Sequence, residues 1–452
     1  MIGSHEAFRR FLDRSRTSPA LYGLVFLCFL LLITDGYDLQ SIAYAAPALI
    51  KTWGLGKTAM GAVFSVGLAG VMIGAMALTP LADRIGARRV LIGCVCAYAA
   101  LTLGTALVST LPGLMAMRLL SGVALGAVMP NAVALIADHA PTRLRNTLIS
   151  AIIAGFALGG SLGGLVGALV LHRFGWPSVF FVGAVAPTLL LAPLVWFLPD
   201  SLSRVLRGEA GLAGERRLER LVPGYAAWAE AQTLAGAQDE PASALGPVQG
   251  LFAAGMWAPT TLLWLVYFLN LLMLYTLSSW LPTVLNLDGL SVTAAGLTAS
   301  SYQLAGVLGM FIGWLCDRLP PGRVLPVAFL GAGAAVFSIS AAGASPVLLV
   351  LGVAASGFFV VGSQTAANAF VSGFYPPSMR ATGLGWALGV GRLGSILGPL
   401  VAGALLSAGV QPRALFQLCA LAGVIAAVAM ALAVWRRPHG PSLPLEAETA
   451  AP

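Results

Sequence analysis

Long apolar runs alternate with short polar or Pro/Gly-rich breaks along almost the whole chain. Each run holds roughly 20 residues or more, the length that an α-helix needs to cross the hydrocarbon core of a bilayer. The pattern therefore predicts twelve membrane-spanning helices. In the first half of the chain they are expected over residues 21–46, 58–80, 90–108, 113–137, 147–171 and 178–198. In the second half they are expected over residues 259–285, 293–315, 324–342, 347–374, 381–407 and 414–434.

The longest polar interval, residues 199–258, divides the chain in two and has no apolar run long enough to cross a membrane. Its charged run from Glu215 to Arg220 is either an interfacial helix or a solvated face. We expect an N-terminal six-helix half over 1–198, a cytoplasmic linker over 199–258, a C-terminal six-helix half over 259–434 and a cytoplasmic tail over 435–452.

Composition supports lipid as the solvent of this chain. Of its 452 residues, 58% are hydrophobic and only 9% are charged. A mean hydropathy of +0.88 excludes a water-soluble domain. The fold class is therefore an all-α membrane protein. None of the five cysteines shows the paired Cys/His spacing of a zinc or haem site, so we expect no metal and no cofactor.

The basic residues orient the spans. With the N-terminus in the cytoplasm, 19 of the 25 Lys and Arg residues fall on cytoplasmic segments, and only Lys51, Lys57, Arg173 and Arg413 face outside. This bias satisfies the positive-inside rule and explains the basic balance without a nucleic-acid partner. We predict a multi-pass, monomeric protein of the bacterial inner membrane with both termini in the cytoplasm.

The N-terminus also imitates a secretory signal peptide, with basic residues up to Arg16, an apolar stretch from Leu21 to Ile33 and a small-residue sequence at Ala43 to Ala45. Asp35 and Asp38 interrupt the end of that apolar region, and the other spans need this helix as a partner. Retention of the segment as the first span is therefore expected.

The two halves resemble each other at an offset of about 235 residues. This offset aligns Asp83 and Arg84 with Asp317 and Arg318. It also aligns three positions of a later loop and two span glycines: Pro141, Arg145 and Thr147 with Pro376, Arg380 and Thr382, and Gly159 and Gly163 with Gly394 and Gly398. Transporters built from such repeats bind substrate near the membrane midplane between the halves.

The loop from Asp83 to Arg89, Asp-Arg-Ile-Gly-Ala-Arg-Arg, resembles the signature loop of the major facilitator superfamily, and Gly313 to Arg318 resembles its second-half copy. Thr79 stands where the pattern has glycine, and Ala87 where it has a basic residue. The resemblance implies the major facilitator fold, with twelve helices in two six-helix halves.

Within that superfamily, the run Asp35-Gly36-Tyr37-Asp38 in the first span resembles the hallmark of the aromatic acid:proton symporter family. The fourth, seventh and eleventh spans agree with it, in the stretches 118–122, 129–131, 279–282 and 385–392. The resemblance implies import of small aromatic carboxylates with the proton as coupling ion, and no enzyme activity. It also adds Tyr37 to the candidate substrate-binding residues.

Asp35 and Asp38 are the acidic residues that do not sit in a loop, a terminus or a helix end. Ionisable groups inside a membrane are costly, so each needs a partner or a function. A spacing of three residues places both on one helical face, about 4.5 Å apart along the axis. Close carboxylates disfavour double ionisation, so this pair is the predicted proton-coupling site. Alternatively, one of them caps a helix broken at Gly36 or pairs permanently with an arginine; which one carries the proton is open at this stage.

Arg118 and Arg392 are the two arginines within spans. Helical-rise arithmetic places Arg118 at the depth of Asp35, so it is the expected counter-ion and a substrate-binding residue. Arg392 stands alone near the middle of the eleventh span, since its repeat counterpart is Ala157. A guanidinium matches a carboxylate in two-point geometry and stacks on aromatic rings, which suits an aromatic acid. Fixed structural pairing of either arginine is the alternative.

Several uncharged side chains in the second half are candidates for reading ring hydroxyls, although each could equally make an interhelical hydrogen bond. Asn270 is the repeat counterpart of Asp35. The full set of these substrate-binding candidates is Asn270, Tyr302, Gln303, Gln364, Asn368 and Trp386.

A cytoplasmic charge set is the predicted gate, latching the inner helix ends in one access state, although the arginines could simply orient the spans. Its members are Asp83, Arg84, Arg88 and Arg145 in the first half and Asp317, Arg318 and Arg380 in the second.

Two rival functions are weighed against import. A proton-coupled exporter of drugs or metabolites typically carries a Gly-Pro pair in span five, where this chain has Gly159-Gly160, although a Gly-Pro pair occurs at Gly398-Pro399 in span eleven. A membrane-embedded enzyme or receptor is opposed by the absence from the sequence of a metal cluster, phosphate-binding loop or nucleophile motif.

Overall fold

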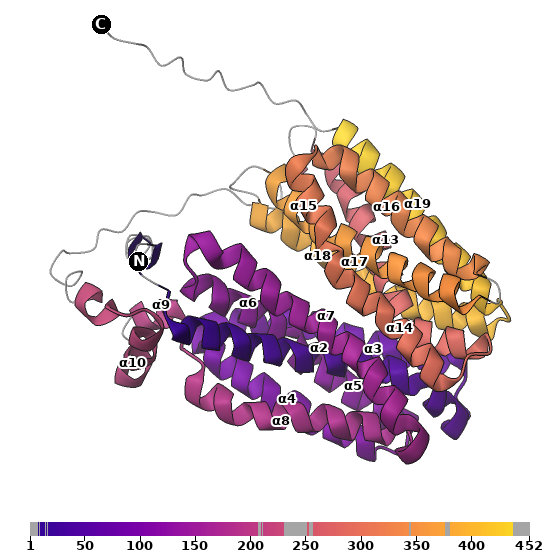
Figure 1. Cartoon of the computed structure of the whole chain (residues 1–452), viewed down its shortest axis with the longest axis horizontal. Coiled ribbons are helices and arrows are strands. Elements are labelled where there is room, and N and C mark those ends of the chain that lie inside the picture. Colours follow the sequence, from indigo (N-terminus) through magenta and orange to yellow (C-terminus); the bar gives the residue numbers. More distant parts are fainter. Residues whose placement is uncertain are drawn as a thin grey trace, which may run out of the picture.

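The computed structural model describes residues 8, 10–13, 15, 17–206, 209, 211–229, 251–252, 256–342, 345–375 and 380–436, which are helices and short connections without a strand (Figure 1). The helices of the N-terminal half are α2 (Pro19–Trp53), α3 (Lys57–Ile85), α4 (Ala87–Leu107), α5 (Leu111–Gly126), α6 (Val128–His139), α7 (Thr142–Phe174) and α8 (Pro177–Phe197). The linker contributes α9 (Leu202–Leu206) and α10 (Gly211–Leu221). The helices of the C-terminal half are α13 (Trp257–Leu287), α14 (Val292–Leu308), α15 (Met310–Arg318), α16 (Pro321–Ala341), α17 (Pro346–Phe374), α18 (Arg380–Ser407) and α19 (Pro412–Trp435).

The described residues form twelve helical spans that are long and apolar enough to cross a membrane, which confirms the predicted all-α membrane fold. Each span matches a predicted one, and the two differ by at most seven residues at either end, the largest difference being at the end of α2. The helices begin and end at residues whose side chains or backbone conformations favour a helix terminus. For example, the hydroxyl of Ser18 caps α2 by accepting a hydrogen bond from the Leu21 N–H, and Gly54 ends the helix with a positive φ of 63°.

Two spans that the hydropathy pattern presents as continuous are interrupted. The fourth span divides into α5 and α6 at Ala127, and the eighth divides into α14 and α15 at Gly309. Pro130 lies in the first turn of α6 and has no N–H to donate, and its ring crowds the carbonyl four residues earlier. The break at Ala127 follows from that clash, which an apolar count does not record.

The two halves share one packing scheme, as the internal repeat predicts. In the first half α7 packs along α2, and in the second α18 packs along α13. A Cβ added at Gly159 of α7 would strike the carbonyl of Ile33, and one added at Gly394 of α18 would strike the carbonyl of Phe268. Both pairs are separated by 235 residues, so the same backbone-to-backbone contact occurs in both halves.

The halves are joined at the end of the bundle opposite the linker, which we call the far end. There Thr58 at the start of α3 donates from its hydroxyl to Ser407 at the end of α18 over 2.8 Å. Ser65 of α3 donates to the Ile396 carbonyl at 2.6 Å, and Ser161 of α7 donates to the Ser300 carbonyl at 3.3 Å.

Buried apolar residues follow the same division. At the far end one cluster takes side chains from both halves, and the rings of Phe64 and Trp280 meet edge to face with centroids 5.3 Å apart. At the opposite end, which we call the linker end, the buried clusters of the two halves are separate. Figure 1 shows the helices diverging toward this end. The structure is therefore closed at the far end and parted at the linker end.

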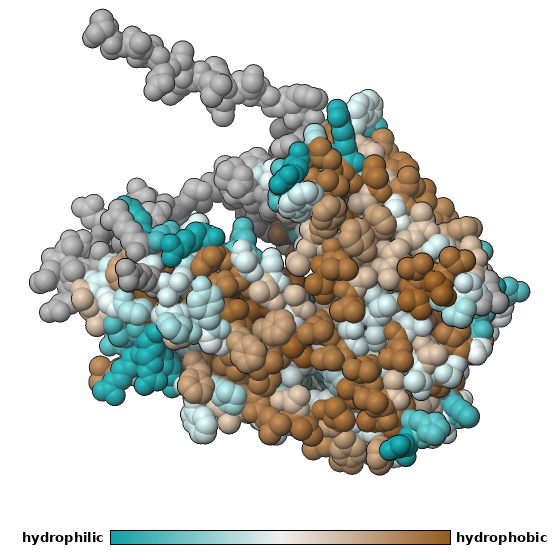
Figure 2. All heavy atoms as spheres, in the orientation of Figure 1, coloured by the Kyte–Doolittle hydropathy of each residue, from teal (hydrophilic) through white to brown (hydrophobic). Residues whose placement is uncertain are grey.

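Apolar side chains also dominate much of the outer surface of both halves (Figure 2). Large examples with more than half of their area exposed include Leu189, Leu308 and Val327. A water-soluble protein rarely exposes such a continuous apolar face, whereas lipid tails cover it without cost.

Candidate functional site

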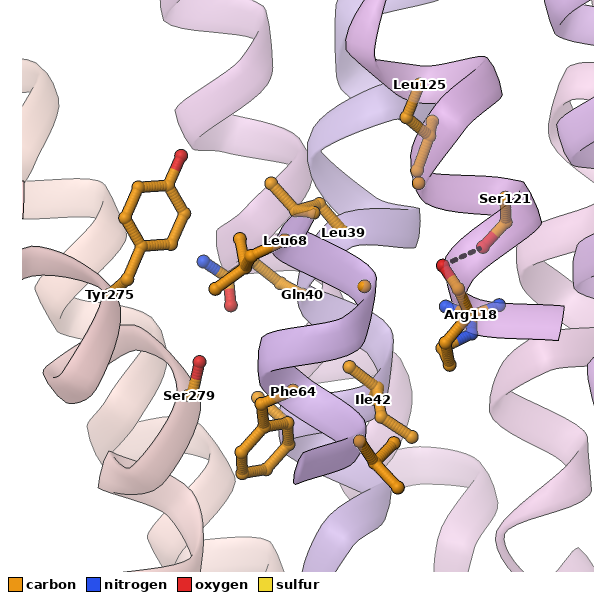
Figure 3. Close-up of a pocket in the computed structure, with 14 residues that line it drawn as sticks. Leu39, Gln40, Ile42, Phe64, Leu68, Arg118, Ser121, Leu125, Tyr275 and Ser279 are labelled. Atoms are coloured by element: carbon orange, nitrogen blue, oxygen red, sulfur yellow. Dashed lines mark hydrogen bonds between the residues drawn. The ribbon is translucent and has the colours of Figure 1, made fainter. Parts of the chain in front are cut away.

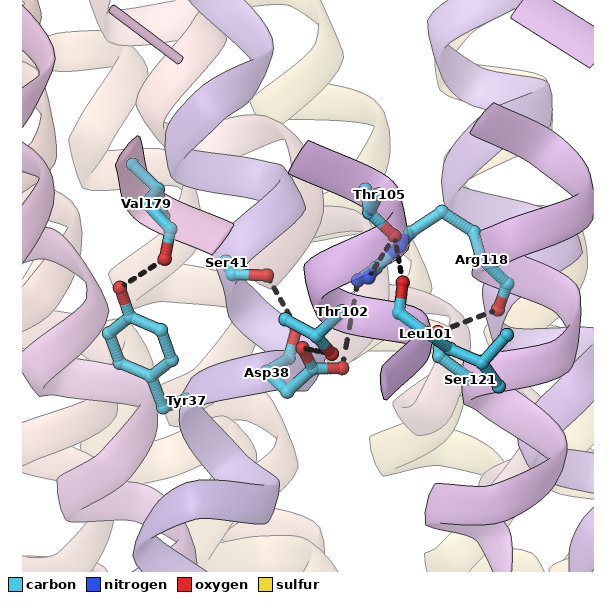
Figure 4. A network of polar contacts seen from close by, with 9 residues as sticks. All are labelled: Tyr37, Asp38, Ser41, Leu101, Thr102, Thr105, Arg118, Ser121 and Val179. Carbon is cyan, nitrogen blue, oxygen red and sulfur yellow. Dashed lines mark hydrogen bonds and ion pairs between the residues drawn. The ribbon is translucent and has the colours of Figure 1, made fainter. Parts of the chain in front are cut away.

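Asp38 lies in a buried polar network drawn from three helices of the N-terminal half (Figure 4). Thr102 of α4 donates to Asp38 Oδ1 at 2.5 Å, and Arg118 Nη1 of α5 lies 3.7 Å from Asp38 Oδ2. Arg118 Nη2 also donates to the hydroxyl of Thr105 at 2.9 Å. Asp38 is 0% exposed and Arg118 is 3% exposed. Removing either partner would leave an uncompensated buried charge, at a cost of about 3–5 kcal/mol.

The ion-pair partner of Arg118 is not the aspartate that its predicted depth in the membrane indicated. The helical rise placed Arg118 level with Asp35. In the structure its ion pair is with Asp38, about one turn further along α2. The arithmetic treats the helices as perpendicular to the membrane, and helix tilt shifts relative depths by this amount. The guanidinium also lies over the ring of Phe180 of α8, 5.1 Å from its centroid, which adds a cation–π contact.

Asp35 is nearly as buried as Asp38, at 3% exposed, but its surroundings are different. No residue of the described part forms a hydrogen bond or an ion pair with its carboxyl group. The charges that act on it are those of Asp38, one helical turn away, and of Arg392 from the other half. Asp35 is thus a buried acidic group without a fixed partner among the described residues, and it is close enough to the boundary of the two halves to interact with the charge of Arg392.

Arg392 reaches this boundary from α18 and is half-buried. Its Nη1 donates to the hydroxyl of Tyr275 of α13 over 3.4 Å, a long hydrogen bond and the only one of the guanidinium within the described residues. Since a guanidinium has five N–H donors, most of those of Arg392 are available to a carboxylate.

A small cavity opens between the halves next to these charges (Figure 3). Arg118 and Gln40 contribute from the N-terminal half, and Tyr275 and Ser279 contribute from α13. In Figure 3 the amide of Gln40 points toward the α13 side, where Tyr275 and Ser279 lie. The volume of the cavity, about 30 Å³, suits one or two waters and is too small for an aromatic ring.

The second half carries a chain of uncharged polar groups. Asn270 of α13 donates to Gln364 Oε1 of α17 at 2.8 Å, and Gln364 Nε2 donates to Asn368 Oδ1 at 3.1 Å. The hydroxyl of Tyr267 donates to the same Asn368 oxygen at 2.9 Å. Asn270 Oδ1 is buried and accepts no hydrogen bond within the described residues. Three of the residues predicted to read a ring are therefore connected.

The other predicted binding residues have separate surroundings. Gln303 of α14 donates weakly to Ser278 over 3.5 Å, and its neighbour Tyr302 is fully buried. Tyr37 donates to the Val179 carbonyl of α8 at 2.8 Å, a contact within the N-terminal half. Trp386 is 45% exposed and stacks on Trp264 near the linker end, with centroids 5.6 Å apart. Among the described residues that line the cavity, Arg118 is the one member of the predicted substrate-binding set. The lining does not include Tyr37, Arg392, Asn270, Tyr302, Gln303, Gln364, Asn368 or Trp386.

The predicted gate residues lie at the linker end. Arg88 donates to the carbonyls of Leu198 and Val195 at 2.9 and 2.5 Å, which holds α4 to the end of α8 in the same half. Arg318 stacks on Trp314 at 4.5 Å. Arg84 and Asp317 are exposed and Arg145 is half-buried, while the side chains of Asp83 and Arg380 lie outside the described part.

Four residues of the site were not among the sequence predictions: Thr102, Thr105, Tyr275 and Gln40. Thr102 and Thr105 satisfy the buried ion pair, and Tyr275 and Gln40 line the cavity. Their hydroxyl and amide groups are common in membrane helices, where most make structural hydrogen bonds. Of these four residues, only Gln40 has a sequence feature that could have indicated a role in the site, because it lies two residues from Asp38 in the same polar segment.

Within the ranges that the structure describes, no group of three or more His, Cys, Asp and Glu side chains could hold a metal ion. The sequence profile of the Major Facilitator Superfamily matches residues 27–288 and again 263–451. The chain belongs to this superfamily. It is accordingly a multi-pass membrane transporter and not an enzyme, and the recognition of the family from its loop motifs is confirmed.

Curated members of the superfamily share substantial identity with this major facilitator chain. A gallate transporter of Pseudomonas putida is 39% identical over 411 residues, which cover 90% of each chain. The 4-hydroxybenzoate transporter PcaK of Pseudomonas aeruginosa is 34% identical, over 88% of this chain and 89% of the relative. The 3-(3-hydroxy-phenyl)propionate transporter of Escherichia coli K12 is 33% identical, over 94% and 96%.

Solved structures of other major facilitator proteins share the fold at low identity. A bacterial homologue of the human lysosomal transporter Spinster, in an inward-facing and unoccupied conformation, has a TM-score of 0.71 at 17% identity and covers 93% of this chain and 98% of its own. The D-xylose-proton symporter has a TM-score of 0.69 at 16% identity, over 90% and 97%. These likenesses confirm the fold.

Proposed function

We propose that this protein imports small aromatic carboxylates by symport with protons, through alternating access at a site between its two halves. The named substrates of its relatives support the substrate class, because gallate, 4-hydroxybenzoate and 3-(3-hydroxy-phenyl)propionate all combine a carboxylate with an aromatic ring. They differ in ring substituents and in chain length, so the carboxylate is the shared feature that a common site would bind.

The balance of buried charge carries the coupling part of the proposal. Away from the helix ends the described spans hold Asp35, Asp38, Arg118 and Arg392, which sum to zero when all are ionised. An anionic substrate alone would leave one uncompensated negative charge in a poorly solvated site. A proton taken up with the substrate restores neutrality. Asp35 is the proposed carrier, because it can be protonated without breaking a hydrogen bond or an ion pair.

Arg392 is the proposed anchor for the substrate carboxylate, assisted by Tyr275 and Gln40 at the cavity. Arg118 then stays with Asp38, and this pair keeps the site neutral and fixed. The ring would extend toward the second half, where the chain of Asn270, Gln364 and Asn368 offers amide groups to its hydroxyls. Gln303 and Tyr302 flank this region, and no cofactor besides the proton is needed.

The positive-inside bias supports an orientation in which the linker end faces the cytoplasm of a bacterial cell and both termini are inside. The parted linker end would then be the inward-facing state, from which substrate and proton leave together. Return to the outward-facing state requires the far-end contacts between α3 and α18 and between α7 and α14 to open. In the outward-facing state the charged groups at the linker end would hold that end closed. Each monomer would complete this cycle by itself.

Transport and its direction can be tested with labelled gallate, 4-hydroxybenzoate and benzoate. Liposomes containing the purified protein should accumulate substrate only under an inwardly directed proton gradient, about tenfold for each pH unit and coupled proton. Cells that express the protein should accumulate the same compounds. Equal uptake with and without a gradient contradicts symport, and a lower substrate content in expressing cells would support the proton-coupled exporter instead.

Alternating access predicts that a covalent tie at the far end stops transport. The hydroxyl oxygens of Thr58 and Ser407 are 2.8 Å apart, so a Thr58→Cys/Ser407→Cys double variant is placed to form a disulfide. We expect oxidation to reduce uptake by at least about tenfold, because the far end could no longer open, and reduction to restore it. Each single cysteine variant is the control. Full uptake by protein that mass spectrometry shows to be completely cross-linked contradicts the mechanism.

A further inference from the structure

A lipid-facing groove runs between α2 and α8 at the linker end of the N-terminal half, away from the transport site. Its volume is about 510 Å³. Its walls are apolar except at one end, where α10 of the linker adds two arginines. The lining residues are Ala20, Gly23, Leu24, Phe26, Leu27, Leu30, Leu190, Pro193, Trp196, Phe197, Arg217, Arg220 and Leu221.

The length and position of the groove correspond to one leaflet of a bilayer. Its α2 wall extends from Ala20 to Leu30, which is about 15 Å of helix. This is half the thickness of a hydrocarbon core of about 30 Å. Trp196 and Phe197 lie at its rim, 69% and 65% exposed, where α8 ends. Aromatic residues with this exposure are typical of the boundary between lipid tails and headgroups.

The helix α10 is fixed at the headgroup end of the groove. Ser18 donates from its hydroxyl to the Leu221 carbonyl at 2.6 Å, and this ties α10 to the start of α2. Leu218 and Leu221 are buried, whereas Arg216 and Arg220 are exposed on the opposite face. In Figure 2 the polar surface of α10, at the lower left, borders the apolar surface of the bundle. This is the arrangement of an interfacial amphipathic helix.

The charged groups at this end of the groove are partly paired, and Arg220 is the lining arginine without an acidic partner among the described residues. Arg217 Nη1 lies 3.3 Å from Asp200, and this ion pair holds the arginine at the groove end. Glu219 accepts hydrogen bonds from the backbone N–H groups of Gly224 and Ala226 at 2.8 and 2.7 Å. Arg220 is exposed and pairs with no acidic group among the described residues.

We propose that this groove binds an anionic phospholipid, with one acyl chain between α2 and α8 and the phosphate at Arg217 and Arg220. Shape alone does not select this occupant. A second groove of similar volume, about 530 Å³, lies between α15, α16 and α17. Within the described part of the chain, Arg323 is its single lining arginine and no amphipathic helix lies at its end. The acyl tails of zwitterionic and anionic phospholipids fit both grooves equally, whereas the pair of arginines on α10 favours an anionic headgroup at the first groove.

Native mass spectrometry of the full-length protein tests this, with phosphatidylglycerol or phosphatidylcholine added to the detergent-purified chain. Wild type should bind one phosphatidylglycerol at least about tenfold more tightly than phosphatidylcholine. The Arg217→Gln/Arg220→Gln variant should lose this preference, and the Arg323→Gln control should keep it. Equal binding of the two lipids by wild type, or equal loss of the preference in both variants, overturns the proposal.

A second variant separates the groove from the charges. An added Cβ at Gly23 meets no atom within 4 Å, so Gly23→Phe fills the groove without disturbing the fold and leaves both arginines in place. It should also weaken phosphatidylglycerol binding by about tenfold, because the acyl chain is displaced. Gly93→Phe on the exposed face of α4, where an added Cβ is equally free, is the matched control. Unchanged binding in Gly23→Phe shows that no chain occupies the groove and contradicts the assignment.

Discussion

Replacement of Asp35 by Asn is expected to abolish proton-driven accumulation while substrate exchange continues. Asparagine resembles a permanently protonated aspartate, so the site stays neutral with substrate bound but can no longer give up a proton inside. Because Asp35 has no hydrogen bond or ion pair among the described residues, the replacement breaks no ion pair. Accumulation under a gradient of one pH unit should fall from about tenfold to about onefold.

Two measurements in liposomes check this expectation. Gradient-driven uptake reports coupling, and exchange of labelled for unlabelled 4-hydroxybenzoate at equal pH reports the remaining cycle. Asp288→Asn is a matched control, because Asp288 belongs to an exposed far-end pair with Arg413 at 3.1 Å that contributes little. Preserved accumulation in Asp35→Asn, or loss of exchange together with uptake in a folded protein, would show that Asp35 does not carry the proton.

Asp38→Asn should behave differently from Asp35→Asn, because it leaves Arg118 buried without its ion-pair partner. The expected result is a loss of stability of about 3–5 kcal/mol. The contrast between the two variants therefore distinguishes a proton carrier from a structural pair, although both residues lie on one helical face.

Replacement of Arg392 by Ala is expected to weaken binding of aromatic carboxylates by about 10- to 150-fold, which corresponds to about 1.5–3 kcal/mol for hydrogen bonds to a charged group. Arg392→Lys should give an intermediate loss, since it keeps the charge but not the two-point geometry. Binding of 4-hydroxybenzoate and of its uncharged methyl ester to each variant is the appropriate measurement. Wild type should prefer the acid, and Arg392→Ala should lose that preference.

The ester comparison separates a role in binding from a role in structure. A variant that merely distorts the site should weaken acid and ester alike, and that outcome would remove Arg392 from the substrate site. Arg413→Ala provides the matched control, because Arg413 is an exposed arginine in the same half whose partner is Asp288. It should bind both compounds as the wild type does.

The spans and their pairing into two halves could be predicted from the sequence because lipid imposes a simple rule. Every spanning segment must satisfy its own backbone in a helix of sufficient length, so apolar length alone locates it. The interruption at Ala127 follows a different rule, the missing N–H of Pro130, which hydropathy does not weigh. Over the charged run of the predicted linker the structure has a helix, α10.

The charged residues of the site could also be predicted, because buried charge in an apolar span is rare and therefore conspicuous. Their partners could not. The pairing of Arg118 with Asp38 depends on the tilt of α5 against α2, and the hydroxyl of Thr102 has no distinctive mark in the sequence. Tyr275 was missed for the same reason, since its contact with Arg392 joins residues 117 positions apart.

The distribution of polar chemistry between the halves has a consequence for how such a protein can change over evolutionary time. Both carboxylates and the Arg118 pair belong to the N-terminal half, whereas the amides of Asn270, Gln364 and Asn368 belong to the C-terminal half. Under the proposed mechanism, energy conversion and molecular discrimination are thus encoded by separate gene segments. Mutations in the segment that encodes the C-terminal half can therefore change the substrate specificity of the transporter, while the proton coupling encoded by the N-terminal half is retained.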